Sequence, residues 1–178
     1  MTRAQLEHII RAAGAIANVQ DLVVIGSQAV LGQFPNAPDE LLVSNEADVF
    51  PRGDAALSDV IDGSIGEGSP FQREFGYYAH GVDETTAILP DGWRDRLILV
   101  TGENTRFVRG WCLEINDLAV SKYAAGREKD LDFTRTLARY RLVTRETLER
   151  RVALTTSIDS AMRGRILARI QRDFAEPA

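Results

Sequence analysis

An apolar run that ends in a glycine–serine turn constrains the fold more than any other feature of the chain. Residues 21–25 are short, continuous and rich in valine, which is typical of a buried strand. Gly26 and Ser27 follow at once, and residues 28–34 have a helical pattern. Glycine lets a backbone approach a ligand closely, and the first N–H groups of a helix favour an anion such as phosphate. The turn therefore indicates either a phosphate site or a junction set by packing alone.

A pair of acidic residues follows on the next predicted strand. The pattern over residues 44–50, which Pro51 ends, predicts a strand in which Glu46 and Asp48 point to the same face. Two adjacent carboxylates repel each other unless a cation lies between them, and oxygen ligands suit Mg²⁺. The alternative is an edge strand whose acidic face meets water. The apolar Val49 and Phe50 that follow favour the metal site.

The rest of the first two thirds predicts helices around a mixed sheet. A helix is expected over residues 2–18, begun by a capping box of Thr2 and Gln5, and another over 55–61. Glycines between residues 63 and 68 indicate a mobile connection. Strands are expected over residues 75–82, 97–101 and 107–113, the last two as a hairpin.

From Asn116 onward the pattern is helical. Helices are expected over residues 117–125, 131–142, 144–154 and 157–174, with Asn116, Thr144 and Ser157 as N-caps. We therefore predict an α/β (α+β) fold. It has an α/β domain over residues 1–115 and a helical region over residues 116–178 that packs on it.

Bulk properties exclude several classes of protein. The 178 residues carry a net charge of −5, which argues against a protein that coats DNA. Cys112 is the only cysteine, so no internal disulfide can form, and two histidines argue against a histidine-rich zinc site. No signal peptide pattern and no membrane-spanning run is present, so a cytoplasmic location is expected.

A lysine-containing segment is a candidate phosphate contact. Lys122, Gly126 and Lys129 fall near one face if the helix continues through Gly126. A lysine there acts as a point charge on phosphate, and Asp130 and Asp132 could orient it or cap the next helix. The alternative is a solvated junction between helices with routine surface charges.

Two further patterns have alternative interpretations. Trp93, Arg94 and Arg96 could stack on a nucleotide base, although such a tryptophan more often anchors a turn on the core. The charged residues over 145–151 indicate a solvated helix face without function.

Together these residues resemble the nucleotidyltransferase superfamily. Its signature is a Gly-Ser turn after a strand, then a helix, then a strand with an acid-x-acid pair; here these are Gly26-Ser27 and Glu46-Ala47-Asp48. The stretch from Lys122 to Lys129-Asp130 resembles motifs of abortive-infection nucleotidyltransferases, the toxins of bacterial type IV toxin–antitoxin systems. The resemblance spans residues 21–137. Glu46 departs from the usual aspartate, and the chain between Ser27 and Glu46 is longer than usual.

The resemblance implies a reaction and a set of site residues. A nucleoside monophosphate would pass from a nucleoside triphosphate to an acceptor hydroxyl on RNA, protein or a small molecule, with Mg²⁺ (or Mn²⁺) as cofactor and an antitoxin as a candidate partner. Asp83 is the candidate third metal carboxylate, or else a turn residue, and Glu114 is a further candidate or a cap. The implied catalytic residues are Glu46, Asp48, Asp83 and Lys122, the metal ligands Glu46, Asp48 and Asp83, and the nucleotide contacts Gly26, Ser27, Lys122 and Lys129. The alternative is an inactive fold that binds nucleotide or another protein.

Overall fold

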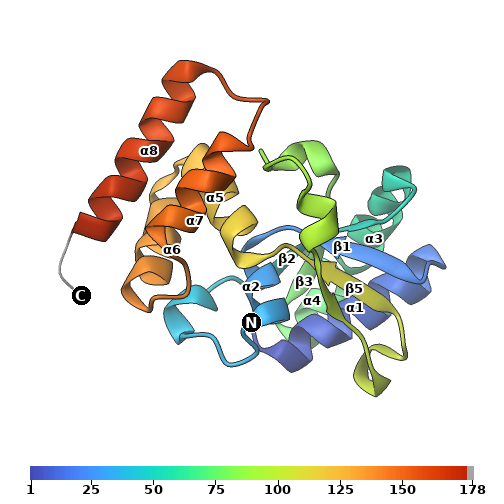
Figure 1. The fold of residues 1–178 in the computed structure, drawn as a ribbon. Helices are drawn as coiled ribbons and strands as arrows, with labels where there is room; N and C mark the ends of the chain where they lie inside the picture. The colour runs from blue at the N-terminus through green and yellow to red at the C-terminus, as the bar shows by residue number, and fades with distance from the viewer. Residues whose placement is uncertain (176–178) are drawn as a thin grey trace. The chain divides into compact units, whose positions relative to one another are not determined.

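The computed structural model describes residues 1–175, which divide into two compact units (Figure 1). The first unit comprises residues 1–86 and 97–113, and the second comprises residues 87–96 and the chain from Glu114 onward. Within residues 1–175, no helix is both long enough and apolar enough to cross a membrane.

The first unit contains a mixed five-stranded sheet with the order β3-β2-β1-β5-β4. Antiparallel pairs join β1 to β2 and β4 to β5, and parallel pairs join β1 to β5 and β2 to β3. The predicted mixed sheet and hairpin are confirmed. The strand bounds are β1 (Asp21–Val24), β2 (Glu46–Pro51), β3 (Tyr78–Gly81), β4 (Ile98–Val100) and β5 (Arg109–Cys112).

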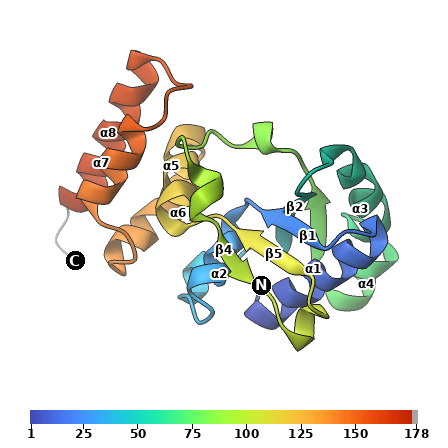
Figure 2. The same cartoon turned by 45° about the vertical axis from the view of Figure 1, so that its right-hand side comes forward.

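Two helices cover one face of this sheet. α1 (Arg3–Ala17) begins at the predicted capping box of Thr2 and Gln5, and its apolar stripe is buried. α3 (Ser58–Ile65) contacts both α1 and β3 (Figure 2). Gly81 on β3 lies so close to α3 that a β-carbon there would be 2.1 Å from the Ser58 carbonyl oxygen. Val49 pairs with Gly81 and shares this covered face, so strand alternation sends Glu46 and Asp48 to the opposite face.

The helix predicted over residues 28–34 is a 3-10 turn, η1 (Ser27–Ala29), followed by one α-helical turn, α2 (Val30–Gln33). The prediction of a mobile, glycine-rich connection over residues 63–68 was wrong in part, because Gly63 lies inside α3. The remaining short elements of this unit are η2 (Asp39–Leu41), η3 (Ala55–Leu57), α4 (Pro70–Phe75), η4 (Glu84–Thr86) and η6 (Glu103–Thr105).

The helix α4 was not predicted, and the strand expected over residues 75–82 was too long. Ser69 caps α4 by accepting a hydrogen bond from the Gln72 N–H, and Pro70 occupies the first turn, where a proline is tolerated. Gly76 ends the helix with a φ of 78°. The aromatic residue Phe75, taken as part of a strand, is therefore the last residue of a helix.

The second unit is helical, as predicted. It comprises η5 (Trp93–Arg96), α5 (Ile115–Ala125), α6 (Glu128–Arg139), α7 (Arg145–Ala153) and α8 (Ser160–Ala175). Thr144 caps α7 as expected, through the Thr147 N–H. Two predicted caps were wrong: α5 begins one residue before Asn116, and Asp159, rather than Ser157, accepts the Met162 N–H at the start of α8.

Two further expectations about this unit are corrected. α5 does not continue through Gly126, which has a φ of 64° in the left-handed region and ends the helix. Arg151 does not belong to a solvated face, because its Nε lies 3.0 Å from the fully buried carboxylate of Asp117. Arg96 also pairs with Asp117, at 2.8 Å.

Trp93 is buried in the same unit, and Arg94 lies over its ring at 4.6 Å. Arg96 is engaged by the Asp117 carboxylate. Burial of the indole agrees with the interpretation of Trp93 as an anchor for its turn rather than as a platform for a base.

Candidate metal centre

Strand register brings four polar side chains together on the sheet face opposite α3. Glu46 and Asp48 alternate along β2, and β2 pairs in parallel with β3. In this register Tyr78 lies opposite Glu46, and His80 lies opposite Asp48. Directly paired residues of neighbouring strands project to the same face, so each carboxylate has an aromatic or imidazole partner beside it.

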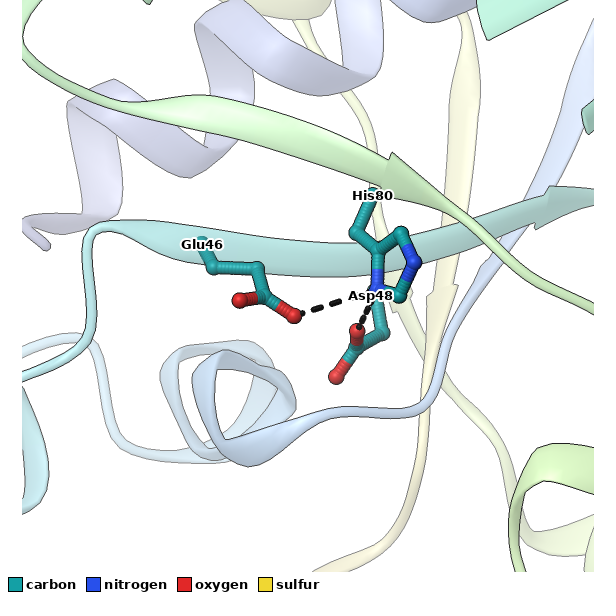
Figure 3. Close-up of side chains that lie close together, drawn as sticks. All are labelled: Glu46, Asp48 and His80. Atoms are coloured by element: carbon teal, nitrogen blue, oxygen red, sulfur yellow. Dashed lines mark hydrogen bonds and ion pairs between the residues drawn. The ribbon is translucent and has the colours of Figure 1, made fainter. Parts of the chain in front are cut away.

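The distances in this cluster fit a divalent cation. His80 Nδ1 lies 3.2 Å from Glu46 Oε1 and 3.1 Å from Asp48 Oδ1 (Figure 3). One possible ligand atom from each of the three residues lies within 4.8 Å of the others. Adjacent ligands of an octahedral ion with bonds near 2.1 Å are roughly 3 Å apart, so the two contacts of His80 have the spacing of neighbouring ligands as well as that of hydrogen bonds.

Tyr78 positions one of the carboxylates. Its hydroxyl donates a hydrogen bond of 3.0 Å to Oε2 of Glu46, which leaves Oε1 facing His80. Burial, together with the hydrogen bond to Glu46, raises the pKa of Tyr78 to about 12, so the hydroxyl keeps its proton. The contact therefore orients Glu46 at any physiological pH.

The electrostatics show an excess of negative charge. Burial and the neighbouring Glu46 raise the pKa of Asp48 to about 6. Burial also opposes ionisation of Glu46, but hydrogen bonds from Asp48 and Tyr78 outweigh it and lower the pKa of Glu46. The pKa of His80 is raised, because the two carboxylates outweigh the effect of burial. A bound cation would offset this negative charge and would compete with protons for the same atoms.

The glycine–serine turn lies against the acidic pair. The Ile25 N–H donates to the Asp48 carbonyl oxygen at 3.1 Å, which extends the pairing of β1 and β2 up to the turn. A β-carbon on Gly26 would lie 1.9 Å from Oδ2 of Asp48. The structure thus brings Gly26 and the acid-x-acid pair into one site.

Asp83 lies outside this cluster. It follows β3, and its Oδ1 accepts hydrogen bonds from the backbone N–H of Thr85 at 2.7 Å and from the Thr85 hydroxyl at 2.5 Å. These bonds lower the pKa of the exposed Asp83 carboxyl. The geometry is that of a turn residue, which is the alternative given for Asp83 above.

Sequence reasoning missed His80, although a signal was present. Tyr78-Ala79-His80 repeats the pattern of Glu46-Ala47-Asp48, in which a small residue faces the covered side and larger polar residues face the other. The same alternation places Asp83 out of phase with His80, even before the strand ends at Gly81. The alternation of side chains along β3 would have favoured His80 over Asp83 as the third member of the metal site.

The lysines are found on different helices of the second unit. Lys122 Nζ on α5 lies 3.2 Å from Oδ1 of Asp130, which agrees with the first of the two roles given for Asp130. Asp130 also accepts a hydrogen bond of 2.6 Å from Arg127. Lys129 is exposed near the start of α6. Their contact with a nucleotide stays a prediction.

Glu114 also belongs to the second unit. It precedes α5 without capping it through its side chain, and Oε1 accepts a hydrogen bond of 2.6 Å from Asn116 Nδ2. Its other oxygen lies 3.7 Å from Arg151. These partners assign Glu114 to the polar network around the start of α5.

Comparison with known proteins identifies the family of the chain. The family described as "Nucleotidyltransferase of unknown function (DUF6036)" matches residues 4–175. The chain belongs to this nucleotidyltransferase family. No match was found among curated proteins or among solved structures. Membership confirms the superfamily that the motifs resemble, and the abortive-infection subtype stays a prediction.

Proposed function

We propose that the protein is a metal-dependent nucleotidyltransferase of the cytoplasm, which transfers a nucleoside monophosphate from a nucleoside triphosphate to an acceptor hydroxyl. One observation carries the proposal. In a chain of a nucleotidyltransferase family, the carboxylates of Glu46 and Asp48 and the imidazole of His80 converge beside the Gly26 turn.

Each part of the site has a role in this proposal. Glu46, Asp48 and His80 would hold the cation, either Mg²⁺ or Mn²⁺. When bound, the ion would supply charge neutralisation on the triphosphate and its leaving group. Gly26 has no side chain, so the turn can lie against the Asp48 carboxylate, and a phosphate bound at the turn would be close to the cation. The Ser27 hydroxyl can donate a hydrogen bond to that phosphate.

The reaction replaces a phosphoanhydride bond of the triphosphate with a phosphoester bond to the acceptor. The acceptor oxygen bonds to the α-phosphorus, the bond from that phosphorus to the β-phosphate oxygen breaks, and pyrophosphate leaves. The hydroxyl proton passes to a base. Asp83 is the candidate from sequence, but its hydrogen bonds from Thr85 make it a weaker proton acceptor.

The finer features of the proposal come from the resemblance. Lys122 and Lys129 would contact phosphate, RNA would be the acceptor, and an antitoxin would be the partner. A lysine fits the first role because it carries a compact charge on a flexible stem. Supplying tRNA, bulk protein and small hydroxyl compounds as separate acceptors tests these features one at a time.

Transfer of label tests the activity directly. The full chain is incubated with each α-³²P-labelled nucleoside triphosphate, Mg²⁺ or Mn²⁺ and total tRNA, and label in RNA is measured together with released pyrophosphate. We expect transfer by the parent protein and none by Asp48→Asn. Asp59→Asn, an exposed acidic position on α3, serves as the matched control and should keep the parent rate. Equal rates for Asp48→Asn and the parent protein would exclude the proposal.

A second candidate is an inactive member of the family that binds nucleotide. It is favoured by the contact of His80 Nδ1 with both carboxylates, since an imidazolium there could neutralise the pair without a metal. Calorimetry with each triphosphate first tests whether the chain binds nucleotide, and the label-transfer assay then separates the two candidates. Binding without pyrophosphate release, for every acceptor supplied, would favour the inactive form.

A further inference from the structure

We propose that His80 is a direct metal ligand and that it biases the site toward a first-row transition cation over Mg²⁺. The inference rests on the metal centre of the proposed function. It goes beyond that function because it concerns which ion the site selects, and a nitrogen ligand in the cluster decides this.

The backbone holds His80 in position for this role. His80 is paired directly with Asp48 in the parallel register of β3 and β2, so the imidazole starts from the strand next to the acidic pair. Its Nδ1 faces both carboxylates at 3.1 and 3.2 Å, as Figure 3 shows. The side chain is 49% exposed, so the imidazole is open to solvent.

Ligand chemistry then sets the preference. Mg²⁺ is a hard ion that binds oxygen ligands and gives up its waters reluctantly. Imidazole nitrogen suits first-row ions such as Zn²⁺, Fe²⁺ and Ni²⁺, and carboxylate oxygen suits Mn²⁺ as well as Mg²⁺. Two carboxylates with one imidazole therefore form a site in which a first-row transition ion can use all three ligands, and Mn²⁺ serves as a paramagnetic probe that also accepts oxygen ligands.

A protonated His80 that acts as a fixed counter-ion is the competing arrangement. In that case Nδ1–H donates to Glu46 and Asp48, and the cation position is filled by the protein's own charge. The two arrangements differ in one observable property, because nitrogen is bonded to the metal in the first and not in the second.

Pulsed electron paramagnetic resonance of the full chain with Mn²⁺ alone, without nucleotide, tests the proposal. We expect one bound Mn²⁺ with a ¹⁴N coupling in its spectrum, and at least a roughly tenfold excess of Mg²⁺ needed to displace half of it. His80→Ala should remove the ¹⁴N coupling and weaken Mn²⁺ binding roughly tenfold or more. His80→Asp should remove the coupling but keep binding, with Mn²⁺ and Mg²⁺ nearer in affinity.

The other histidine of the chain provides the matched control. His8 lies on α1, where its Nδ1 is 2.7 Å from the Tyr77 hydroxyl, so His8→Ala should leave the coupling unchanged. Circular dichroism of each variant verifies the fold.

Three outcomes would overturn the inference: no Mn²⁺ binding by the parent chain, bound Mn²⁺ without ¹⁴N coupling, or equal affinities of parent and His80→Ala. The label-transfer assay is scored separately. Label transfer without nitrogen ligation would contradict this inference alone. Nitrogen ligation without label transfer would contradict the proposed activity alone.

Discussion

Gly26 and Asp48 are in contact across the junction of β1 and β2, and a β-carbon on Gly26 would lie 1.9 Å from the Asp48 carboxylate. Gly26 has a φ of −75°, which any residue can adopt, so the backbone conformation does not require glycine here. Glycine is suited to the position because a side chain would overlap with the carboxylate.

Substitution of Gly26 should disturb the metal site without unfolding the protein. In Gly26→Ala the new methyl group must displace the Asp48 carboxylate, so we expect Mn²⁺ affinity to fall roughly tenfold or more. Calorimetry with the metal alone measures this. Gly63→Ala is the control, because Gly63 has no heavy atom within 4 Å of the added carbon. Parent-like affinity in Gly26→Ala would show that the turn and Asp48 can separate without consequence.

Asp21 should make the free energy of unfolding depend on pH in the acid range. Arg109 Nε donates to the Asp21 carboxylate at 2.7 Å, as does Trp111 Nε1. Chiefly through Arg109, and against the effect of burial, the pKa of Asp21 is lowered to about 2. A carboxyl group whose pKa is lower in the folded than in the unfolded state stabilises the fold at pH values above its unfolded-state pKa. This stabilisation is lost as the pH falls toward the folded-state pKa.

We therefore expect Asp21→Asn to lower the free energy of unfolding by about 1 kcal/mol at pH 7, after allowance for solvent screening. The difference from the parent should shrink as pH falls from about 4 to about 2, because protonation removes the charge in the parent as well. Urea denaturation across this range measures it, with Asp59→Asn as the control. If the difference in free energy of unfolding between the parent and Asp21→Asn does not change with pH, the stabilisation does not come from the Asp21 charge.

Gly126 should be intolerant of a side chain. It ends α5 with a φ of 64°, and a β-carbon would lie 2.2 Å from Nη1 of Arg169, which donates to the Tyr123 carbonyl. Gly126→Ala should lower the free energy of unfolding by about 1–2 kcal/mol through left-handed strain and this contact.

The opposite sign is expected at Gly164, which lies inside α8 with no heavy atom within 4 Å of an added β-carbon. Gly164→Ala should raise the free energy of unfolding by about 0.5–1 kcal/mol, because alanine is the better helix former. Thermal melts of both variants provide the comparison. A melting temperature that rises in Gly126→Ala would rule out the strain.

Cys112 should be unreactive in the native protein. The thiol is fully buried, and burial raises its pKa to about 12, so little thiolate forms at pH 8. We expect a disulfide-exchange reagent to label the thiol only after denaturant is added. Rapid stoichiometric labelling without denaturant would mean that the region around β5 opens readily.

Local patterns in the sequence determined the parts of the site that lie on one element. Alternation along a strand is a property of its backbone, so Glu46 and Asp48 could be assigned to one face without knowledge of any neighbour. The capping box of Thr2 and Gln5 is equally local, since its two hydrogen bonds span three residues. The order of strand and turn around Gly26 is confirmed for the same reason, although a 3-10 turn and one α-helical turn follow in place of the longer helix.

Only the tertiary structure decided which residues join the acidic pair. His80 is 32 residues from Asp48, and its place beside it follows from the parallel register of β2 and β3, which depends on how both strands pack beneath α1 and α3. Asp83 has the expected chemistry, yet it lies beyond the end of β3 and bonds to Thr85. The sequence by itself determined which side chains can hold a cation. Packing decided which of them meet, because contacts between distant segments are set by the summed burial of the core and not by any local motif.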